Sequence, residues 1–80
     1  MGVRNELFAA GDVYIDFPQE DVMFHFEHAT GKIFRKFYWR PAEDQVDRSS
    51  SLFAESLLYG EAVGPERYIA CGRSQQPAAS

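Results

Sequence analysis

The fold is decided by residues 22–39, VMFHFEHATGKIFRKFYW. Two runs rich in β-branched and aromatic residues flank a short connection that ends in Gly31, a composition typical of paired strands. Gly31 can adopt the positive φ that is needed where a type I turn passes into a bulge. The pattern predicts a β-hairpin with the three-residue loop 29–31, in which His28 lies opposite Lys32.

This register divides the side chains of the hairpin between two faces, because neighbouring residues of a strand point to opposite sides of the sheet. One face carries Val22, Phe24, Phe26, Phe34, Lys36 and Tyr38. The other face carries Met23, His25, Glu27, Ile33, Arg35, Phe37 and Trp39. Apart from Lys36 the first face is apolar or aromatic, so we expect it to face the core.

The second face would form a large exposed apolar patch if only one side of the sheet were covered. Trp, Met and Arg are enriched at protein interfaces, and Trp and Arg often supply much of the binding energy. The predicted partner-binding residues are Met23, His25, Ile33, Arg35, Phe37 and Trp39. In the alternative, the N-terminal segment or residues 41–48 cover this face, which then becomes a second, minor core.

Upstream of the hairpin, two further elements are expected. Apolar residues alternate with other residues over 12–17, which predicts a strand that ends at Pro18. Residues 3–10 are expected to form a short helix, because Gly11 is a helix stop signal.

Downstream of the hairpin, helix and strand signals follow in turn. The serines at 49–51 can cap free backbone amides and Gly60 can end a helix, so a helix is expected near 50–60. Residues 42–44 follow a proline and are acidic, which is typical of a first helical turn. Residues 66–71 include a short apolar run that predicts a last strand.

Together these elements predict an α+β fold in which one helix packs on a small, mainly antiparallel sheet. The parts of this fold are the β-hairpin 22–39, strands near 12–17 and 66–71, and the helix near 50–60. A chain of 80 residues has room for one core. We therefore expect a single domain over residues 1–72 and, because 73–80 lack an apolar pattern, a disordered C-terminal tail.

The cysteine content and the lack of long apolar runs predict a cytoplasmic protein. Cys71 is the single cysteine, so it cannot form an intramolecular disulfide, whereas small secreted domains usually depend on several disulfides. The N-terminus lacks the apolar run of a signal peptide, and no run approaches the roughly 20 apolar residues of a spanning helix. We expect no membrane anchor.

The charge pattern raises a second hypothesis, binding of single-stranded nucleic acid. The formal net charge is −4, but residues 32–40 carry basic side chains interleaved with aromatic ones and contain no acid. Cations could contact phosphates while the rings stack on bases. Strand alternation divides this strip between two faces, and the surrounding negative charge opposes phosphate, so nucleic acid is the less favoured partner.

The sequence contains no recognisable catalytic, cofactor or metal motif. His25 and His28 have H-x-x-H spacing, but an odd separation on a strand sends them to opposite faces. Cys71 lies in an apolar run and is expected to be a core residue rather than a nucleophile. Gly60 and Gly64 do not form a phosphate-binding loop. We therefore expect a protein that is not an enzyme and that binds neither cofactor nor metal.

The favoured function is a small acidic protein-binding module. Among such proteins, immunity proteins, antitoxins and phage-encoded anti-defence inhibitors, including anti-CRISPR proteins, block another macromolecule. We expect an inhibitor of this type that occludes a basic functional surface, because opposite charges speed the encounter. A homodimer formed through the hairpin is an alternative, since two-fold dimers are the commonest oligomers.

Overall fold

A computed structural model of the chain describes residues 6–40 and 42–71. Its elements, in chain order, are α1 (Glu6–Ala10), β1 (Val13–Phe17), the 3₁₀ turn η1 (Pro18–Glu20), β2 (Val22–Glu27), β3 (Lys32–Phe37), β4 (Glu43–Val46), α2 (Ser51–Tyr59), β5 (Glu61–Val63) and α3 (Pro65–Ala70). The predicted tail 73–80 lies outside the described residues.

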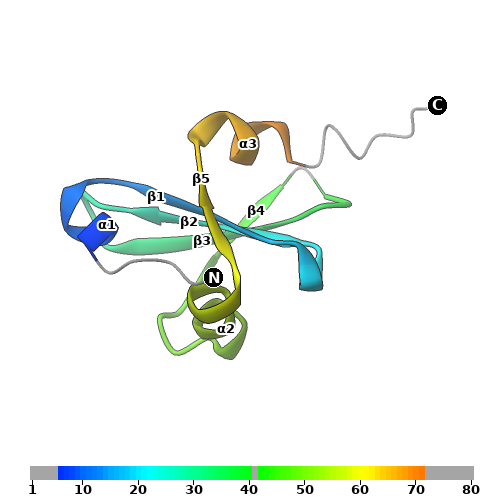
Figure 1. Cartoon of the computed structure of the whole chain (residues 1–80), viewed down its shortest axis with the longest axis horizontal. Coiled ribbons are helices and arrows are strands. Elements are labelled where there is room, and N and C mark those ends of the chain that lie inside the picture. Colours follow the sequence, from blue (N-terminus) through cyan, green and yellow to red (C-terminus); the bar gives the residue numbers. More distant parts are fainter. Residues whose placement is uncertain (1–5, 41, 72–80) are drawn as a thin grey trace.

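The strands form one antiparallel sheet in the order β4-β3-β2-β1-β5. Helix α2 lies on one side of this sheet and α3 on the opposite side (Figure 1). The predicted α+β class is confirmed, as are the strand near 12–17, the hairpin and the helix near 50–60. Residues 42–44 do not form the predicted helical turn, because β4 pairs with β3 as an edge strand there.

The predicted hairpin register is wrong by one residue. Glu27, rather than His28, lies opposite Lys32, so the loop has four residues. Gly31 does have a positive φ of 74°, and its N–H donates to the carbonyl of Glu27 at 2.8 Å. His28 leaves the ladder because its backbone N–H donates instead to Asp12 Oδ1 at 3.0 Å. This shift exchanges the two faces of β3 relative to β2.

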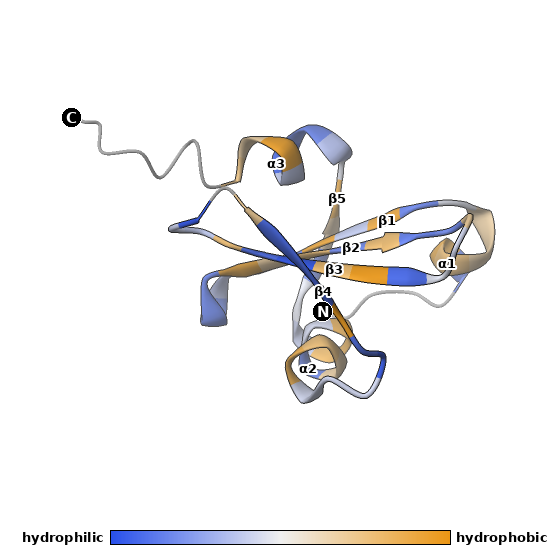
Figure 2. Ribbon diagram, turned by 180° about the vertical axis from the view of Figure 1, so that it is seen from behind, coloured by the Kyte–Doolittle hydropathy of each residue, from blue (hydrophilic) through white to orange (hydrophobic). Residues whose placement is uncertain are grey.

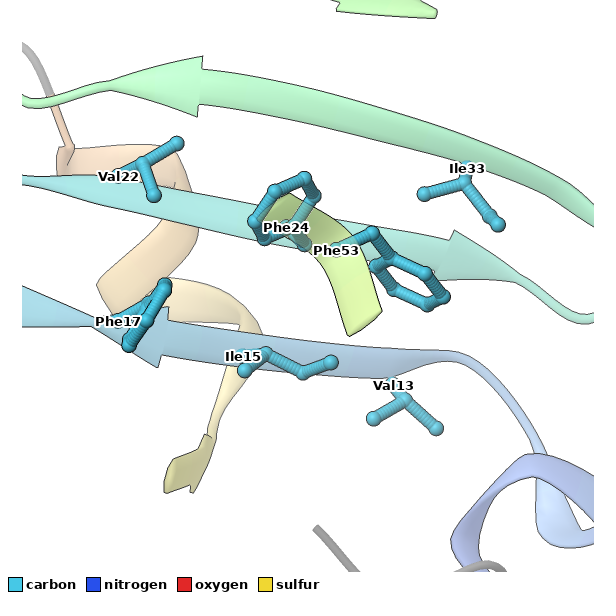
Figure 3. Close-up of a cluster of buried hydrophobic side chains, with 7 residues drawn as sticks. All are labelled: Val13, Ile15, Phe17, Val22, Phe24, Ile33 and Phe53. Atoms are coloured by element: carbon cyan, nitrogen blue, oxygen red, sulfur yellow. The ribbon is translucent and has the colours of Figure 1, made fainter. Parts of the chain in front are cut away.

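The face of the sheet toward α2 holds the main core (Figure 3). Its buried side chains are Val13, Ile15, Phe17, Val22, Phe24, Ile33 and Phe53. Phe53 comes from α2 and meets Phe24 edge to face, with ring centroids 5.3 Å apart. Helix α2 begins where the Ser50 hydroxyl accepts the Phe53 N–H at 3.4 Å. Burial of each large apolar side chain contributes about 1.5–3 kcal/mol, so this face supplies much of the folding free energy.

The predicted strand 66–71 is also wrong, because this segment forms helix α3. Pro65 occupies the start of the helix, where its missing N–H costs nothing, and Glu66 lies in the first turn. Tyr68 and Cys71, three residues apart, are both buried, whereas Ile69 between them is exposed. That spacing is helical, and alternation along a strand does not produce it.

Helix α3 covers the second face of the sheet. Of the segments predicted to cover it, the described part of the N-terminal one packs Phe8 of α1 against the main core instead, and Glu43–Val46 pair with β3 as a strand. Tyr68 and Cys71 pack with Met23 into a smaller core. The buried carboxylate of Asp16 accepts hydrogen bonds from Tyr38 and from Arg67 Nη2, the latter at 2.5 Å.

Figure 2 shows hydrophobic segments within β1, β2 and β3, and a β4 that is hydrophilic over most of its length. Charged edge strands of this kind resist unwanted pairing.

Candidate protein-binding surface

The shifted register separates the residues that were predicted to bind a partner. Met23 and His25 lie on the α3 side of the sheet, and Ile33 and Phe37 lie on the α2 side. Met23 and Ile33 are each only 3% exposed, so both are core residues. The prediction that all six share one face is wrong, because it depended on pairing His28 with Lys32.

Three of the predicted residues nevertheless remain together as a stack at the end of β3. The Arg35 guanidinium lies 4.9 Å from the centre of the Phe37 ring. The Phe37 and Trp39 rings are nearly parallel, 17° apart, with centroids separated by 4.7 Å. Trp39 is 61% exposed and forms the outer end of what we call the aromatic stack, Arg35, Phe37 and Trp39. Arg35 and Phe37 share one face of β3, and Trp39, in the turn after the strand, continues the same two-residue spacing.

Strand β4 orients the cationic end of this stack. Asp44 lies opposite Arg35 in the sheet and accepts from its Nη2 at 3.3 Å. The same carboxylate lies 3.9 Å from Arg40 Nη1. Both ion pairs are partly exposed, so each contributes at most about 1 kcal/mol to stability. Their effect is to hold the guanidinium over the Phe37 ring, while Trp39 stays exposed.

A polar cleft lies on the other side of the sheet, between α3 and β1 to β4. It has a volume of 430 Å³ and is lined by Tyr14, His25, Lys36, Glu43, Tyr68, Ile69 and Cys71. Lys36 Nζ donates to the backbone carbonyl of Tyr68 at 2.8 Å and lies 4.5 Å from the centre of its ring. The Tyr68 hydroxyl donates to Glu43 Oε1 at 2.5 Å. Burial, and then this hydrogen bond, raises the pKa of Tyr68.

Sequence reasoning missed this cleft. The available signal was Lys36, the one charged residue on the hairpin face that was predicted to form the core. In the structure Lys36 lies opposite Met23, on the face that α3 covers. Because α3 was predicted as a strand, the contribution of Tyr68 to the cleft had no sequence signal.

The two histidines have structural contacts near the start of β1. His25 Nε2 hydrogen-bonds Asp12 Oδ2 at 2.9 Å, and His28 Nδ1 hydrogen-bonds the Phe8 carbonyl at 3.0 Å. The hydrogen bond from His25 lowers the pKa of Asp12, with a further contribution from the His28 N–H. Within residues 6–40 and 42–71, no three side chains of the His, Cys, Asp and Glu types gather as metal ligands would.

The remaining sequence predictions concern Cys71 and the membrane. Cys71 caps the C-terminus of α3 and is buried in the smaller core, where burial raises the pKa of its thiol, so the prediction of a core cysteine is confirmed. Among the helices of the described residues, none has the length and apolar character needed to span a bilayer.

Comparison with known proteins identifies the family. The family model described as Tis1 immunity protein matches residues 1–72. The chain is 33% identical over 66 residues to the protein named Immune protein Tis1 of Pseudomonas aeruginosa strain UCBPP-PA14, and the match covers 81% of this chain and 86% of that protein. It also resembles a chain in the crystal structure of the complex between the Type VI effector Tas1 and its immunity protein, with a TM-score of 0.81 and 33% identity over 89% of this chain and 95% of that one.

These matches confirm the prediction of an immunity-type inhibitor that acts on another protein. The chain belongs to the Tis1 immunity protein family.

Proposed function

We propose that this chain binds a type VI effector protein and neutralises it as a non-catalytic inhibitor, by covering a functional surface of the effector. The support is the similar solved structure, which is a complex of a type VI effector with its immunity protein. Because the free Cys71 thiol needs no oxidising compartment, we also propose that this binding takes place in the cytoplasm.

The observation that carries the binding site is the aromatic stack. An exposed Trp held rigid by stacking on Phe37 loses little side-chain entropy when it enters a pocket of a partner. Trp and Arg are the residue types that most often anchor interfaces. We therefore assign the effector contact to the Trp39 end of β3, with Arg35 beside it.

The effector surface that this stack meets is proposed to be basic. The chain carries 12 acidic and eight basic residues, and Glu20, Glu43 and Asp47 are among its exposed acids. Long-range attraction between a negative inhibitor and a positive target raises the association rate and falls as salt is added. A homodimer remains the competing arrangement, and size-exclusion chromatography with light scattering distinguishes it from a monomer.

The structure gives nucleic-acid binding little support. Lys36 is buried, and Arg35 pairs with Asp44, so the basic residues of 32–40 do not form one exposed strip. A mobility-shift titration with single-stranded oligonucleotides at low salt should therefore show no complex.

The test begins by finding the effector. Affinity capture from nuclease-treated host lysate, read by mass spectrometry, should retain a type VI effector with the wild-type chain. That effector is then purified, and its Kd is measured for wild type, Trp39→Ala and Leu58→Ala. Loss of a central Trp costs about 2 kcal/mol or more, which is about a 30-fold rise in Kd.

Leu58→Ala is the matched control, because Leu58 is 63% exposed but lies on α2. It should leave the Kd within about threefold of wild type. A Trp39→Ala variant that binds as tightly as wild type would move the contact away from the aromatic stack. Failure of the wild-type chain to retain any effector would overturn the proposed function itself.

A further inference from the structure

An apolar pocket opens on the α2 side of the sheet, between α1, α2 and the hairpin. It has a volume of 250 Å³ and is lined by Phe8, Phe26, Ile33, Arg48, Phe53 and Leu57. Ile33 and Phe53 also belong to the main core (Figure 3), so the pocket is the place where that core reaches the surface. Sites for drug-sized ligands have volumes of about 300–1,000 Å³. The smaller volume of this pocket therefore suits a single apolar side chain.

The lining of the pocket carries an unbalanced positive charge. Among the described residues, Arg48 is the one charged residue that lines the pocket. Its guanidinium lies against the hairpin loop, since a Cβ atom added to Gly31 would be 3.4 Å from Arg48 Nη2. The acids of the adjoining segments have other partners, because Asp47 accepts a backbone N–H two residues on at 3.4 Å and Glu27 accepts the Thr30 hydroxyl at 2.6 Å. None of the ion pairs within residues 6–40 and 42–71 includes Arg48.

The pocket and the aromatic stack lie along one face of β3. Ile33 in the pocket wall and Phe37 in the stack both pack on the α2 side, and Arg35 lies between them on that face. Four residues of a strand span about 13 Å. A specific protein interface buries about 800 Å² on each partner, which is wider than this separation. One bound effector can therefore contact both the stack and the pocket.

We propose that this pocket receives one apolar side chain of the effector, and that an acidic group next to that side chain forms an ion pair with Arg48. This inference rests on the proposed function, because both groups belong to the bound effector. Burial of the apolar side chain supplies affinity. The bound effector also excludes water from around Arg48, which strengthens an ion pair there. One acid beside an apolar residue is compatible with an effector surface that is basic as a whole.

The first experiment fills the pocket and measures the Kd for the captured effector by titration calorimetry. Leu57→Phe places a larger ring in the pocket wall, so the effector side chain loses its space and the Kd should rise at least about tenfold. Leu58→Phe is the matched control, since it makes the same change at the next residue of α2, which is 63% exposed and does not line the pocket. Its Kd should stay within about threefold of wild type. The melting temperatures, measured by circular dichroism, should match that of the wild type, because the new ring enters space that the wild-type chain leaves empty.

The second experiment removes the charge. Arg48→Gln should raise the Kd about fivefold or more and make binding less sensitive to salt. Lys32→Gln is its control, because Lys32 is an exposed cation of β3 that does not line the pocket, and its Kd should stay within about threefold of wild type. Among alanine substitutions of exposed acids of the effector, one should raise the Kd for the wild-type chain but have no further effect for Arg48→Gln. Arg48→Gln also gives the answer if Leu57→Phe does not fold.

Octanoate, a free apolar carboxylate, distinguishes an effector side chain from a small ligand. Saturable binding of octanoate to the free wild-type chain, lost in Arg48→Gln and without effect on the Kd for the effector, would assign the pocket to a small ligand and overturn the proposal. If Leu57→Phe and Arg48→Gln both bind the effector within about threefold of wild type while Trp39→Ala does not, the pocket proposal is wrong and the proposed function stands. Absence of any effector complex with the wild-type chain would instead refute the proposed function.

Discussion

The two faces of the sheet are built on different principles. On the α2 side, the buried cluster is apolar, and the buried Ser56 of α2 donates its hydroxyl to the Phe53 carbonyl of its own helix. On the α3 side, Asp16 and Lys36 are buried among tyrosines, and hydrogen bonds connect the helix to the strands. The apolar face follows from local hydrophobic patterning, whereas the polar face depends on partners distant in the sequence. The difference indicates that folding energy is concentrated on the α2 face, whereas the α3 face depends on hydrogen bonds between polar side chains.

The largest effect is expected from the apolar face. Phe24→Ala removes a fully buried ring that meets Phe53 and leaves a cavity that the rigid strands cannot close. We expect a loss of about 3–5 kcal/mol in the free energy of unfolding, measured by urea denaturation. A domain of this size has about 5–15 kcal/mol in total, so the variant should be marginally folded. Leu58→Ala, on the outer side of α2, should change the free energy by less than about 0.5 kcal/mol.

A loss below about 1 kcal/mol for Phe24→Ala would show that the two faces do not differ in the way described. It would mean that the side chains around Phe24 relax into the space, which close-packed cores resist.

The sequence predicted the elements that local patterns specify, and it failed where contacts between distant residues decide the structure. The alternation of Val13, Ile15 and Phe17 and the helix stop at Gly60 are local signals, and both led to correct elements. The hairpin register was not local, because Asp12 captures the N–H of His28 sixteen positions away. No pattern within the hairpin distinguishes a three-residue from a four-residue loop when that distant carboxylate is ignored.

The candidate site was predicted in part for a related reason. Arg35 and Phe37 lie on one face of β3 and Trp39 follows two residues later, so this spacing keeps the three together in either register. Met23 and His25 were added from the neighbouring strand, and the one-residue shift removed them from that face. The polar cleft depends on α3, whose short segment contains both a helical and a strand-like spacing of apolar residues.

An intermediate effect is expected from the network that joins α3 to the sheet. Asp16 is buried and accepts from Tyr38 and Arg67, so Asp16→Ala leaves the Tyr38 hydroxyl without its acceptor. Hydrogen bonds to charged groups contribute about 1.5–3 kcal/mol, and we expect a loss in this range on chemical denaturation.

Arg67→Ala is the comparison for this network. The Arg67 side chain is 60% exposed, so water replaces much of its interaction, and its loss should cost at most about 1 kcal/mol. Equal costs for the two substitutions would show that the ion pair with Arg67, rather than the buried Tyr38 hydrogen bond, accounts for the cost of losing Asp16.

The smallest effect concerns alkaline pH and separates the two faces without removing a core side chain. Burial, together with the hydrogen bond to Glu43, raises the pKa of Tyr68 above its ordinary value of 10.0. The stability that this provides is fully present below pH 10 and is lost as the pH rises, because the unfolded chain then releases the phenolic proton first. One pH unit above 10, the loss from Tyr68 is up to about 1.4 kcal/mol.

The variant Tyr68→Phe tests this. Its free energy of unfolding should be lower than that of the wild type at neutral pH, but it should fall less steeply between about pH 9 and 11, roughly one unit on either side of the ordinary tyrosine pKa. Tyr59→Phe, which changes an exposed ring on α2, should leave the alkaline fall as it is in the wild type. If Tyr68→Phe and wild type lose stability in parallel, the hydroxyl of Tyr68 is open to water in the folded state, and the α3 face does not bury its polar groups in the way described.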